Sequence, residues 1–364
     1  MSTLSPLHDI HTDLGASFTD FAGWRMPVRY TSERAEHHAV REAAGIFDLS
    51  HMAEIEVTGP EAARALDFAV VGNISAVAVG RARYTMLCHS TGGVLDDLVV
   101  YRLAEHRFLV VANAANAAVV TVELRDRAHG FSAEVADRSA DYALIAVQGP
   151  RSADIVGAVT DADLAALRYY ASTPATVQGQ EALLARTGYT GEDGFELYCP
   201  AAQAADLWRI LADVGRPHGL LPAGLACRDT LRLEAGMPLY GNELHIGVTP
   251  FEVGLGRVVK FDKPATFVGR AALAARQAAE SGQVLVGLAG NGRRAARHGY
   301  PVLDGDTQVG VVTSGALSPT LGRPIAMASV PQALSEIGTA LTVDIRGRRE
   351  PVEVTRIPFY SRSA

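Results

Sequence analysis

Apolar and polar residues follow two different periods along this chain of 364 residues. Residues 53–58 read AEIEVT and alternate strictly, with Ala53, Ile55 and Val57 on one side, which predicts a half-buried strand. Residues 31–46 begin with capping residue types and then repeat apolar positions at helical spacing, which predicts a helix. The chain therefore combines strands and helices rather than relying on one of them.

The same local pattern occurs twice. Residues 53–69 and residues 144–159 each read as a strand, a Gly-Pro pair and a helix, and Pro60 would take the first helical position, which proline favours. Two such short copies do not establish a duplication. They do indicate related strand–helix units in an α+β fold.

The rest of the chain divides into two parts by its pattern of apolar and turn residues. Strands are predicted at residues 108–114 and within 182–200, where two runs flank a glycine-rich turn like a hairpin. Helices are predicted at residues 201–215 and 223–236. From residue 275 a helix ends, and short β-like runs separated by turn residues follow. Their spacing predicts a small antiparallel barrel or sandwich, so we place a domain boundary there.

Charge and hydrophobicity exclude several classes of protein. The net charge is −7 and no long basic run is present, so nonspecific nucleic-acid binding is disfavoured as a main role. No apolar stretch approaches the ~18 residues that a membrane helix requires. The N-terminus lacks both an early positive cluster and an apolar core, so it reads as neither a signal peptide nor a transit peptide. We expect no membrane association.

The three cysteines, Cys88, Cys199 and Cys227, are far apart and odd in number. Their spacing fits neither a disulfide framework nor a zinc site, and free thiols suit a reducing compartment. We therefore expect a cytoplasmic protein without a metal. No Walker, GxSxG, HExxH or kinase motif is present.

The most informative segment is GGVLDDLVVYR at residues 92–102. Two glycines make a turn and an apolar strand follows, so the adjacent acids Asp96 and Asp97 point to opposite faces of that strand. One of them can therefore enter a cavity, where a buried carboxylate is costly unless it is paired or used. From the residues alone, binding backbone amides in a turn is the more common role for such aspartates.

A second segment, RTGYTGEDGFELY at residues 186–198, has glycine at every third position. The spacing is not that of a dinucleotide-binding loop, and the alternating FELY run predicts a strand rather than a helix. Glu196 then lies on a strand, with Tyr189 in the preceding turn. A carboxylate among aromatic rings suits a flat heterocycle with amino groups, although an exposed strand glutamate is the more common case.

A third segment is AGLACRDTLRLEAG at residues 223–236, where Arg228 and Arg232 lie four positions apart and share a helix face. Asp229 can pair with Arg232 at i,i+3. The simpler interpretation is an ion pair on the helix surface. The functional interpretation is a guanidinium presented to an anionic ligand group, which its fork geometry suits.

Together these segments resemble the T-protein of the glycine cleavage system, and the resemblance runs nearly from end to end. Matching stretches follow one another in the family's order. They are FAGWRMPVRY (21–30), GIFDLSHMAEIEVTGP (45–60), YTMLCHSTGGVLDDLVVYR (84–102), VVANAAN (110–116), RTGYTGEDGFELY, GLACRDTLRLEAGMPLYGNEL (224–244), FVGRAAL (267–273), GVVTSGALSPTLGRPIAMA (310–328) and PFY (358–360). Any one stretch is modest support, but their number and order make the resemblance specific.

The resemblance implies a three-domain cloverleaf around a central folate cavity. The first α+β domain would comprise residues 1–52 and 138–240, the second residues 53–137 and 241–274, and a β-barrel-like domain residues 275–364. It also implies an enzyme. An aminomethyl group on the lipoyl arm of the H-protein gives its methylene to tetrahydrofolate, and ammonia leaves without the help of a metal.

The resemblance also assigns residues. Asp97 matches the family's catalytic aspartate and Asp96 is then its neighbour, while Glu196 resembles the pterin-binding glutamate. Arg228 resembles the folate-contacting arginine. Further folate contacts are implied for Tyr84, Tyr189, Met52, Asn113 and Arg362.

Related functions stay open at this point. The same fold serves folate-dependent demethylase modules, which normally accompany a flavin domain that is missing from this sequence. It also serves folate-binding proteins that support iron–sulfur clusters or RNA modification, whose lysine- and cysteine-containing motif is replaced here by GLACRDTLRLE. The basic cluster Arg293, Arg294 and Arg297 could receive an acidic carrier protein, although a solvated loop is the simpler interpretation.

Overall fold

The computed structural model describes residues 2–279 and 282–362. Within these residues the chain forms two compact units that mix helices and strands, which confirms the predicted α+β class. The first unit comprises the chain up to Leu87, Asp96–Arg228 and Asp262–Phe267, and the second comprises Cys88–Leu95, Asp229–Phe261 and the chain from Val268 onward. The division into three domains stays a prediction.

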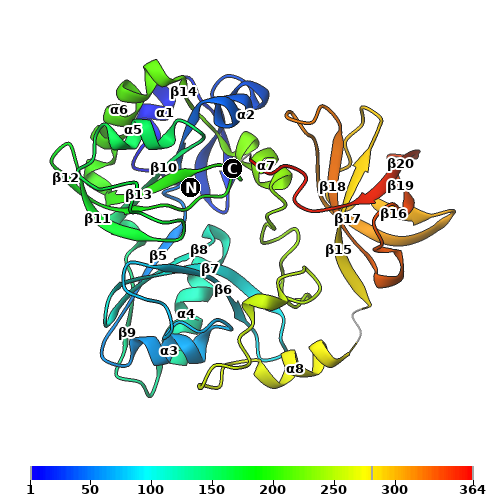
Figure 1. Ribbon diagram of the computed structural model, residues 1–364, viewed down its shortest axis with the longest axis horizontal. Helices are drawn as coiled ribbons and strands as arrows, with labels where there is room; N and C mark the ends of the chain where they lie inside the picture. The colour runs from blue at the N-terminus through cyan, green and yellow to red at the C-terminus, as the bar shows by residue number, and fades with distance from the viewer. Residues whose placement is uncertain (1, 280–281, 363–364) are drawn as a thin grey trace. The chain divides into compact units, whose positions relative to one another are not determined.

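One sheet of the first unit, called here the β10 sheet, has the strand order β11-β12-β13-β10-β4-β14 (Figure 1). These strands span Ser172–Val177, Gln180–Ala185, Gly194–Pro200, Tyr142–Gln148, Ala44–Asp48 and Leu220–Pro222. Helices α5 (Ser152–Gly157) and α6 (Ala204–Gly215) pack on one face, where Leu197 and Trp208 belong to the core. Because side chains alternate along a strand, Glu196 points to the opposite face.

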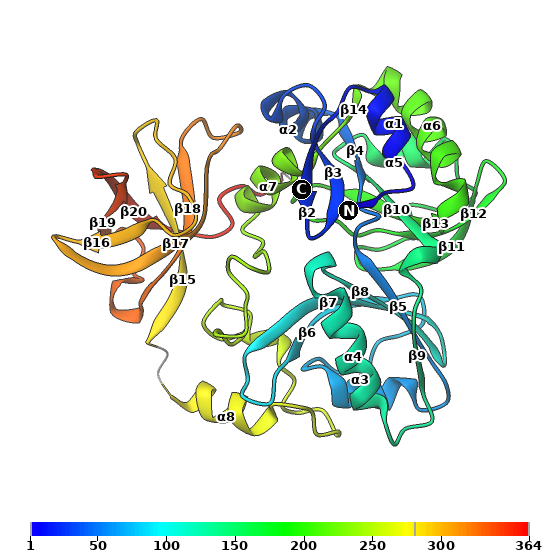
Figure 2. The ribbon, with the colours of Figure 1, turned by 180° about the vertical axis from the view of Figure 1, so that it is seen from behind.

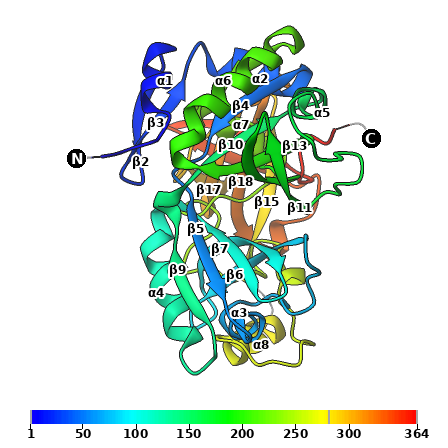
Figure 3. The same ribbon diagram turned by 90° about the vertical axis from the view of Figure 1, so that its left-hand side faces the viewer.

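The other large sheet of this unit, called here the β7 sheet, has the order β6-β7-β8-β5-β9. Its strands span Ala82–Cys88, Val94–Ala104, Arg107–Ala112, Ala53–Thr58 and Glu134–Asp137. Helices α3 (Ala62–Ala69) and α4 (Ala117–Ala128) pack on each other and contact β8 and β9 (Figure 3). The strands predicted at 53–58 and 108–114 are confirmed. The polar side of β5 is not solvated, however, because Glu54 is 1% exposed.

The N-terminal segment adds a small sheet in the order β1-β3-β2 (Figure 2). Its elements are β1 Thr3–Leu4, α1 His8–Asp13, β2 Ser17–Phe21 and β3 Trp24–Arg29, followed by α2 Glu33–Glu42. Helix α2 is shorter than the predicted span of 31–46. Ser32 caps it by accepting the N–H of Ala35 at 3.1 Å, and from Ala44 onward the chain is the fully buried strand β4. Burial between β10 and β14 outweighs the helical spacing of those residues.

Both Gly-Pro pairs follow a strand and precede a helix, as predicted. Gly59 and Gly149 have φ values of +119° and +129°, a region that only glycine adopts readily. A Cβ atom would lie 2.5 Å from the carbonyl oxygen of Ser132 and 2.6 Å from that of Ala43, respectively. One detail differs from the prediction: Pro60 lies two residues before α3, not at its first position.

The second unit contains a closed barrel, which confirms the predicted C-terminal β domain. The order around the barrel is β15-β18-β17-β16-β19-β20. These strands span Gln283–Gly290, Pro324–Pro331, Thr307–Leu317, Pro301–Asp304, Ala340–Ile345 and Arg348–Thr355, and helix α8 spans Arg270–Ala278. Neighbouring strands pair antiparallel, and valine and leucine side chains fill the interior.

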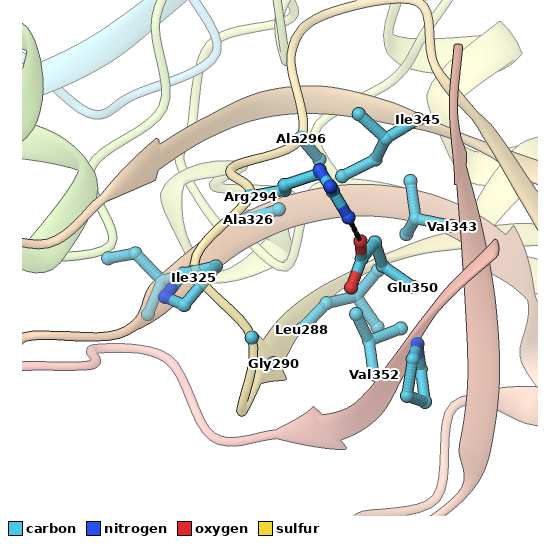
Figure 4. A pocket seen from close by; sticks show the side chains of 13 residues that line it. Leu288, Gly290, Arg294, Ala296, Ile325, Ala326, Val343, Ile345, Glu350 and Val352 are labelled. Atoms are coloured by element: carbon cyan, nitrogen blue, oxygen red, sulfur yellow. Dashed lines mark hydrogen bonds and ion pairs between the residues drawn. The ribbon is translucent and has the colours of Figure 1, made fainter. Parts of the chain in front are cut away.

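The barrel holds a small pocket with an apolar wall (Figure 4). Its free space is about 20 Å³, which is room for about one water molecule. Arg294 donates to Glu350 beside it at 2.6 Å, and Arg297 donates to the carbonyl oxygen of Gly315 at 3.1 Å. Two arginines of the predicted docking cluster therefore already have partners in the barrel, and docking there stays a prediction.

Helix α7, Leu225–Glu234, ends in a buried ion-pair network. Arg232 is 1% exposed and donates to Asp229 at 2.8 Å, to Glu243 at 3.0 Å and to Ser314 at 2.7 Å. The predicted pair with Asp229 is confirmed, but it involves a buried guanidinium rather than a surface one. A buried charge needs such partners, so Arg232 serves to join the helix to the barrel.

Lys263 anchors a distant segment to the first unit. Its buried Nζ donates to the carbonyl oxygens of Asp67 at 2.5 Å, Val70 at 2.6 Å and Gly72 at 2.7 Å. The same ammonium lies 4.5 Å from the ring centre of Phe267. The acceptors lie at the C-terminal end of α3, where the helix dipole favours a cation. Residues 262–267 are thereby held against α3.

We expect Lys263→Met to lower the free energy of unfolding by about 2–4 kcal/mol, because it leaves three buried carbonyl groups without a donor. Urea unfolding followed by circular dichroism measures the change. Lys260→Met is the matched control, because this lysine is only half-buried and its loss should cost about 0.5 kcal/mol or less. Equal losses in the two variants would contradict the anchoring role of Lys263.

Candidate active site

Strand β7 carries its two adjacent acids in its interior rather than at a turn. Consecutive side chains alternate, so Asp96 and Asp97 point to opposite faces, as predicted. Asp96 points toward the start of α4, where Asn116 donates to it at 2.6 Å. Asp97 shares the other face with Tyr101, and that face meets the β10 sheet.

Asp96 is fully enclosed, with an exposed fraction of 0%. It accepts from the backbone N–H of Asn113 at 3.0 Å, from the side-chain amide of Asn113 at 2.8 Å and from Asn116. Burial, and then the charge of Asp97, raises the pKa of Asp96 to about 7. Since its oxygens are bonded to the loop at 113–116, Asp96 organises that loop.

Asp97 is half-buried and accepts two side-chain hydrogen bonds. Tyr84 donates its hydroxyl at 2.9 Å, and the amide of Asn113 donates at 2.8 Å. Burial raises the pKa of Asp97, and the bonds from Tyr84 and Asn113 offset part of that rise. Asn113 thus bonds to both acids and fixes their relative position.

Glu196 lies on the face of the β10 sheet opposite α5 and α6. Its Oε2 accepts from the hydroxyl of Thr187 at 2.5 Å and from the hydroxyl of Tyr101 at 3.3 Å. Tyr198 donates in turn to the Tyr101 hydroxyl at 3.3 Å. These bonds join β7 to β13, so the face of the β10 sheet that carries Glu196 meets the β7 sheet here. Among the described residues both of these bonds go to Oε2 of Glu196.

The glycine-rich turn before Glu196 accommodates a buried amide. A Cβ atom at Gly188 would lie 2.0 Å from Oε1 of Gln148, and one at Gly194 would lie 2.3 Å from its Nε2. The Gln148 amide donates to the carbonyl oxygen of Thr187 at 3.0 Å and accepts from the hydroxyl of Thr190 at 3.0 Å. The glycines therefore permit a close approach between backbone and side chain.

A cation and an uncharged imidazole lie near this turn. The guanidinium carbon of Arg228 lies 4.8 Å from the ring centre of Tyr189, within cation–π distance. Burial lowers the pKa of Arg228, and the neighbouring Tyr189 and Glu196 offset part of that shift. Burial, and then the charge of Arg228, lowers the pKa of His51 to about 4.

Tyr170 lies within electrostatic reach of both acids. Burial raises the pKa of Tyr170, followed by the neighbouring Tyr169 and by the charges of Glu196 and Asp97. Its φ of +58° is in the left-handed region, which costs a residue with a Cβ about 1–2 kcal/mol. The backbone N–H of Tyr170 donates to the carbonyl oxygen of Arg186 at 3.0 Å and holds this conformation. Such strain is concentrated at functional sites.

Most of the residues predicted for the site lie in the first unit. They are Tyr84, Asp97, Asn113, Tyr189, Glu196 and Arg228. Met52 is half-buried and directly precedes β5. Arg362 is exposed and belongs to the second unit, so its contact with folate stays a prediction.

Sequence reasoning missed Tyr101 and Thr187, which orient Glu196, and did not single out Tyr170. The strand period contains the signal for Tyr101, because it follows Asp97 by four residues and so shares its face. No local pattern marks Thr187 or Tyr170, since both come from irregular segments. We call Tyr84, Asp97, Tyr101, Tyr170 and Glu196 the acid–tyrosine cluster.

The acid–tyrosine cluster combines two carboxylates with different surroundings. Glu196 is held in one orientation by hydroxyl groups and suits the N–H groups of a flat heterocycle. Asp97 has a raised pKa and can accept a proton or stabilise a developing positive charge. Tyr84 and Tyr170 are only half-buried, and a tyrosine ring offers a surface on which a flat ring can stack.

In the part of the chain that the structure describes, no group of three His, Cys, Asp or Glu side chains could hold a metal ion. No described helix is both long and apolar enough to cross a membrane. Cys88, Cys199 and Cys227 are free and buried.

Comparison with known proteins identifies the family of this chain. The family model of the GCVT N-terminal domain matches residues 7–263, and that of the glycine cleavage T-protein C-terminal barrel domain matches residues 283–361. The chain is 62% identical to an aminomethyltransferase of Saccharopolyspora erythraea, over 99% of this chain and 98% of that relative. It is 42% identical to an aminomethyltransferase of Bacillus subtilis, over 98% and 99% of the two chains.

A solved structure extends the comparison to three dimensions. The glycine cleavage system aminomethyltransferase T from Bartonella henselae matches with a TM-score of 0.93 and 36% sequence identity, over 99% of this chain and 98% of that one. Sequence and fold therefore agree over nearly the full length of both proteins. This chain belongs to the glycine cleavage T-protein family.

Proposed function

We propose that this chain is the aminomethyltransferase of glycine cleavage. It takes the methylene of an aminomethyl group from the lipoyl arm of the H-protein, transfers it to tetrahydrofolate and releases ammonia. The observation that carries the proposal is the position of Asp97, an acid of raised pKa, on the same strand face as Tyr101, which reaches Glu196. The free, buried cysteines support a reducing compartment, and we place the reaction in the cytoplasm.

Glu196 is proposed to recognise the pterin ring. A reduced pterin presents an amino group and a ring N–H on one edge, and a fixed carboxylate accepts both. Thr187 and Tyr101 hold Oε2 of Glu196, so the carboxylate does not have to reorient when the ligand arrives. Arg228, stacked on Tyr189, is proposed to contact the folate. Further folate contacts are proposed for Met52, Tyr84, Asn113, Tyr170 and Arg362.

Asp97 is proposed to assist the chemistry. N5 of tetrahydrofolate forms a bond to the methylene carbon as the carbon–sulfur bond breaks, and the lipoyl sulfur leaves as a thiol. Ammonia then departs, N10 closes the bridge, and the N–H protons must be accepted. The carbon passes through a cationic, iminium-like stage. An ionised Asp97 stabilises that charge and accepts a proton, while Tyr84 and Asn113 hold it in place.

The proposed function is tested against its alternative, a folate-binding protein of the same fold that acts as a demethylase partner or supports iron–sulfur clusters or RNA modification. Incubation with aminomethylated H-protein and tetrahydrofolate should yield methylenetetrahydrofolate and ammonia in equal amounts. Both products can be measured by absorbance and by an ammonia assay. Folate binding without release of ammonia would favour the alternative.

We expect Asp97→Asn to keep folate binding but to lose turnover by about 10²–10⁴-fold, the usual contribution of a positioned base. Asp96→Asn is the comparison. It places an amide where three N–H groups donate, so it should lower the unfolding midpoint as well. Steady-state kinetics, folate titration and thermal unfolding separate the two effects. Near-normal turnover of Asp97→Asn would remove Asp97 from the mechanism.

We expect Tyr84→Phe to move the acid limb of turnover to higher pH. Asp97 must be ionised to act, so turnover falls as pH drops through its pKa. The hydroxyl of Tyr84 lowers that pKa, and its loss should raise the pKa by about one unit, the effect of one hydrogen bond to a charge. The kcat–pH profile measures this shift, with Tyr300→Phe in the barrel as control. If the acid limb does not move, Tyr84 does not set the pKa of Asp97 during turnover.

A further inference from the structure

Glu54 of β5 is a buried acid whose role is not explained by the fold. It is 1% exposed, and neither carboxyl oxygen has a hydrogen-bond partner among the described residues. Its backbone is ordinary, since its N–H donates to the hydroxyl of Ser139 at 3.0 Å and its carbonyl oxygen accepts from Arg138 at 2.8 Å. A buried polar group without a partner is costly and calls for a reason.

The strand register places Glu54 behind the acid–tyrosine cluster. Glu54 pairs with Val111 of β8, and Val111 pairs with Val99 of β7. Val99 lies between Asp97 and Tyr101 on the same strand face. Glu54 therefore lies across the sheet from Val99, which is two residues along β7 from Asp97. It lies on the face of the β7 sheet that meets the β10 sheet.

Acidic and phenolic groups of the surrounding strands lie within electrostatic reach of Glu54. Asp137 lies on the adjacent strand β9, and Glu196 lies on β13 of the β10 sheet. Tyr198 of β13 and Tyr142 of β10 also lie within its electrostatic reach. Burial, and then the charges of Asp137 and Glu196, raises the pKa of Glu54 well above its usual value.

We propose that Glu54 is a positioning residue of the pterin site, held as an uncharged acid so that no like charge acts on Glu196 from behind. This inference rests on the proposed function. An ionised Glu54 would repel Glu196 and strain its bonds to Thr187 and Tyr101. A bound pterin ring would also exclude water from the part of the site next to Glu54. Binding of a reduced folate therefore favours the protonated acid and draws a proton to it at a pH above its pKa.

Glu56 provides an internal comparison. It lies two residues further along β5, so it points to the same face. Glu56 accepts from Nε of Arg107 at 2.5 Å and is only half-buried. Two glutamates of one strand face thus have opposite surroundings, one paired with a cation and one enclosed without a partner. The alternation of apolar and polar residues along β5 therefore does not by itself explain why Glu54 is enclosed without a partner.

The experiment is a calorimetric titration with 5-methyltetrahydrofolate, a stable reduced folate, across the neutral to alkaline range. In the unmodified protein the Kd should rise by up to about tenfold per pH unit above the pKa of Glu54, as one linked proton requires. Glu54→Gln should remove that rise, and Glu56→Gln should keep it. Asp96 titrates in all three proteins, so the difference between their profiles isolates Glu54.

The same pH profile in the unmodified protein and in Glu54→Gln would overturn the inference while leaving the proposed function intact. Failure of the unmodified protein to bind the folate would overturn the proposed function, and the inference with it. If Glu54→Gln does not fold, titration of the unmodified protein in buffers of different ionisation enthalpy measures proton uptake directly. Uptake at alkaline pH supports the inference, and its absence overturns it.

Discussion

A single amide, the side chain of Asn113, bonds to two neighbouring carboxylates that point to opposite faces of one strand. The strand period of two assigns Asp96 to the helix side and Asp97 to the side of Glu196. A shift of one residue would exchange those faces and turn Asp96, in place of Asp97, toward Glu196. The division of labour between two identical side chains therefore follows from backbone geometry, which Asn113 fixes.

The two sheets of the first unit divide their faces in the same way. Helices cover one face of each sheet with apolar contacts, and the opposite faces meet through hydroxyl and carboxyl groups. A polar layer inside a protein is stable only when its hydrogen bonds are made. Here the bonds of Tyr101 and Thr187 to Glu196 meet that requirement. The layer is consequently held in one arrangement.

The sequence predicted those parts of the structure that depend on local patterns. Alternation and turn chemistry were sufficient for β5, for the hairpin of β12 and β13, and for the barrel strands. Helix α2 was predicted too long, because tertiary burial of Ala44–Asp48 outweighed helical spacing. The burial of Arg232 and Glu54 could not be predicted from the sequence pattern. Each lies on a polar face of its helix or strand, and another part of the protein covers that face. Thr187 and Tyr170 likewise join the cluster only through the packing of distant segments.

Gln148 limits how the glycine-rich turn that holds Gly188 and Gly194 can change between related proteins. Its amide fills the space that side chains at Gly188 and Gly194 would need, so a larger residue at either position requires a shorter one at 148. These three positions are therefore expected to covary as a block across related proteins. Tyr189, which lies between the two glycines in sequence, is not bound by this constraint. Divergence in ligand preference would then accumulate at Tyr189, while the backbone that presents it is retained.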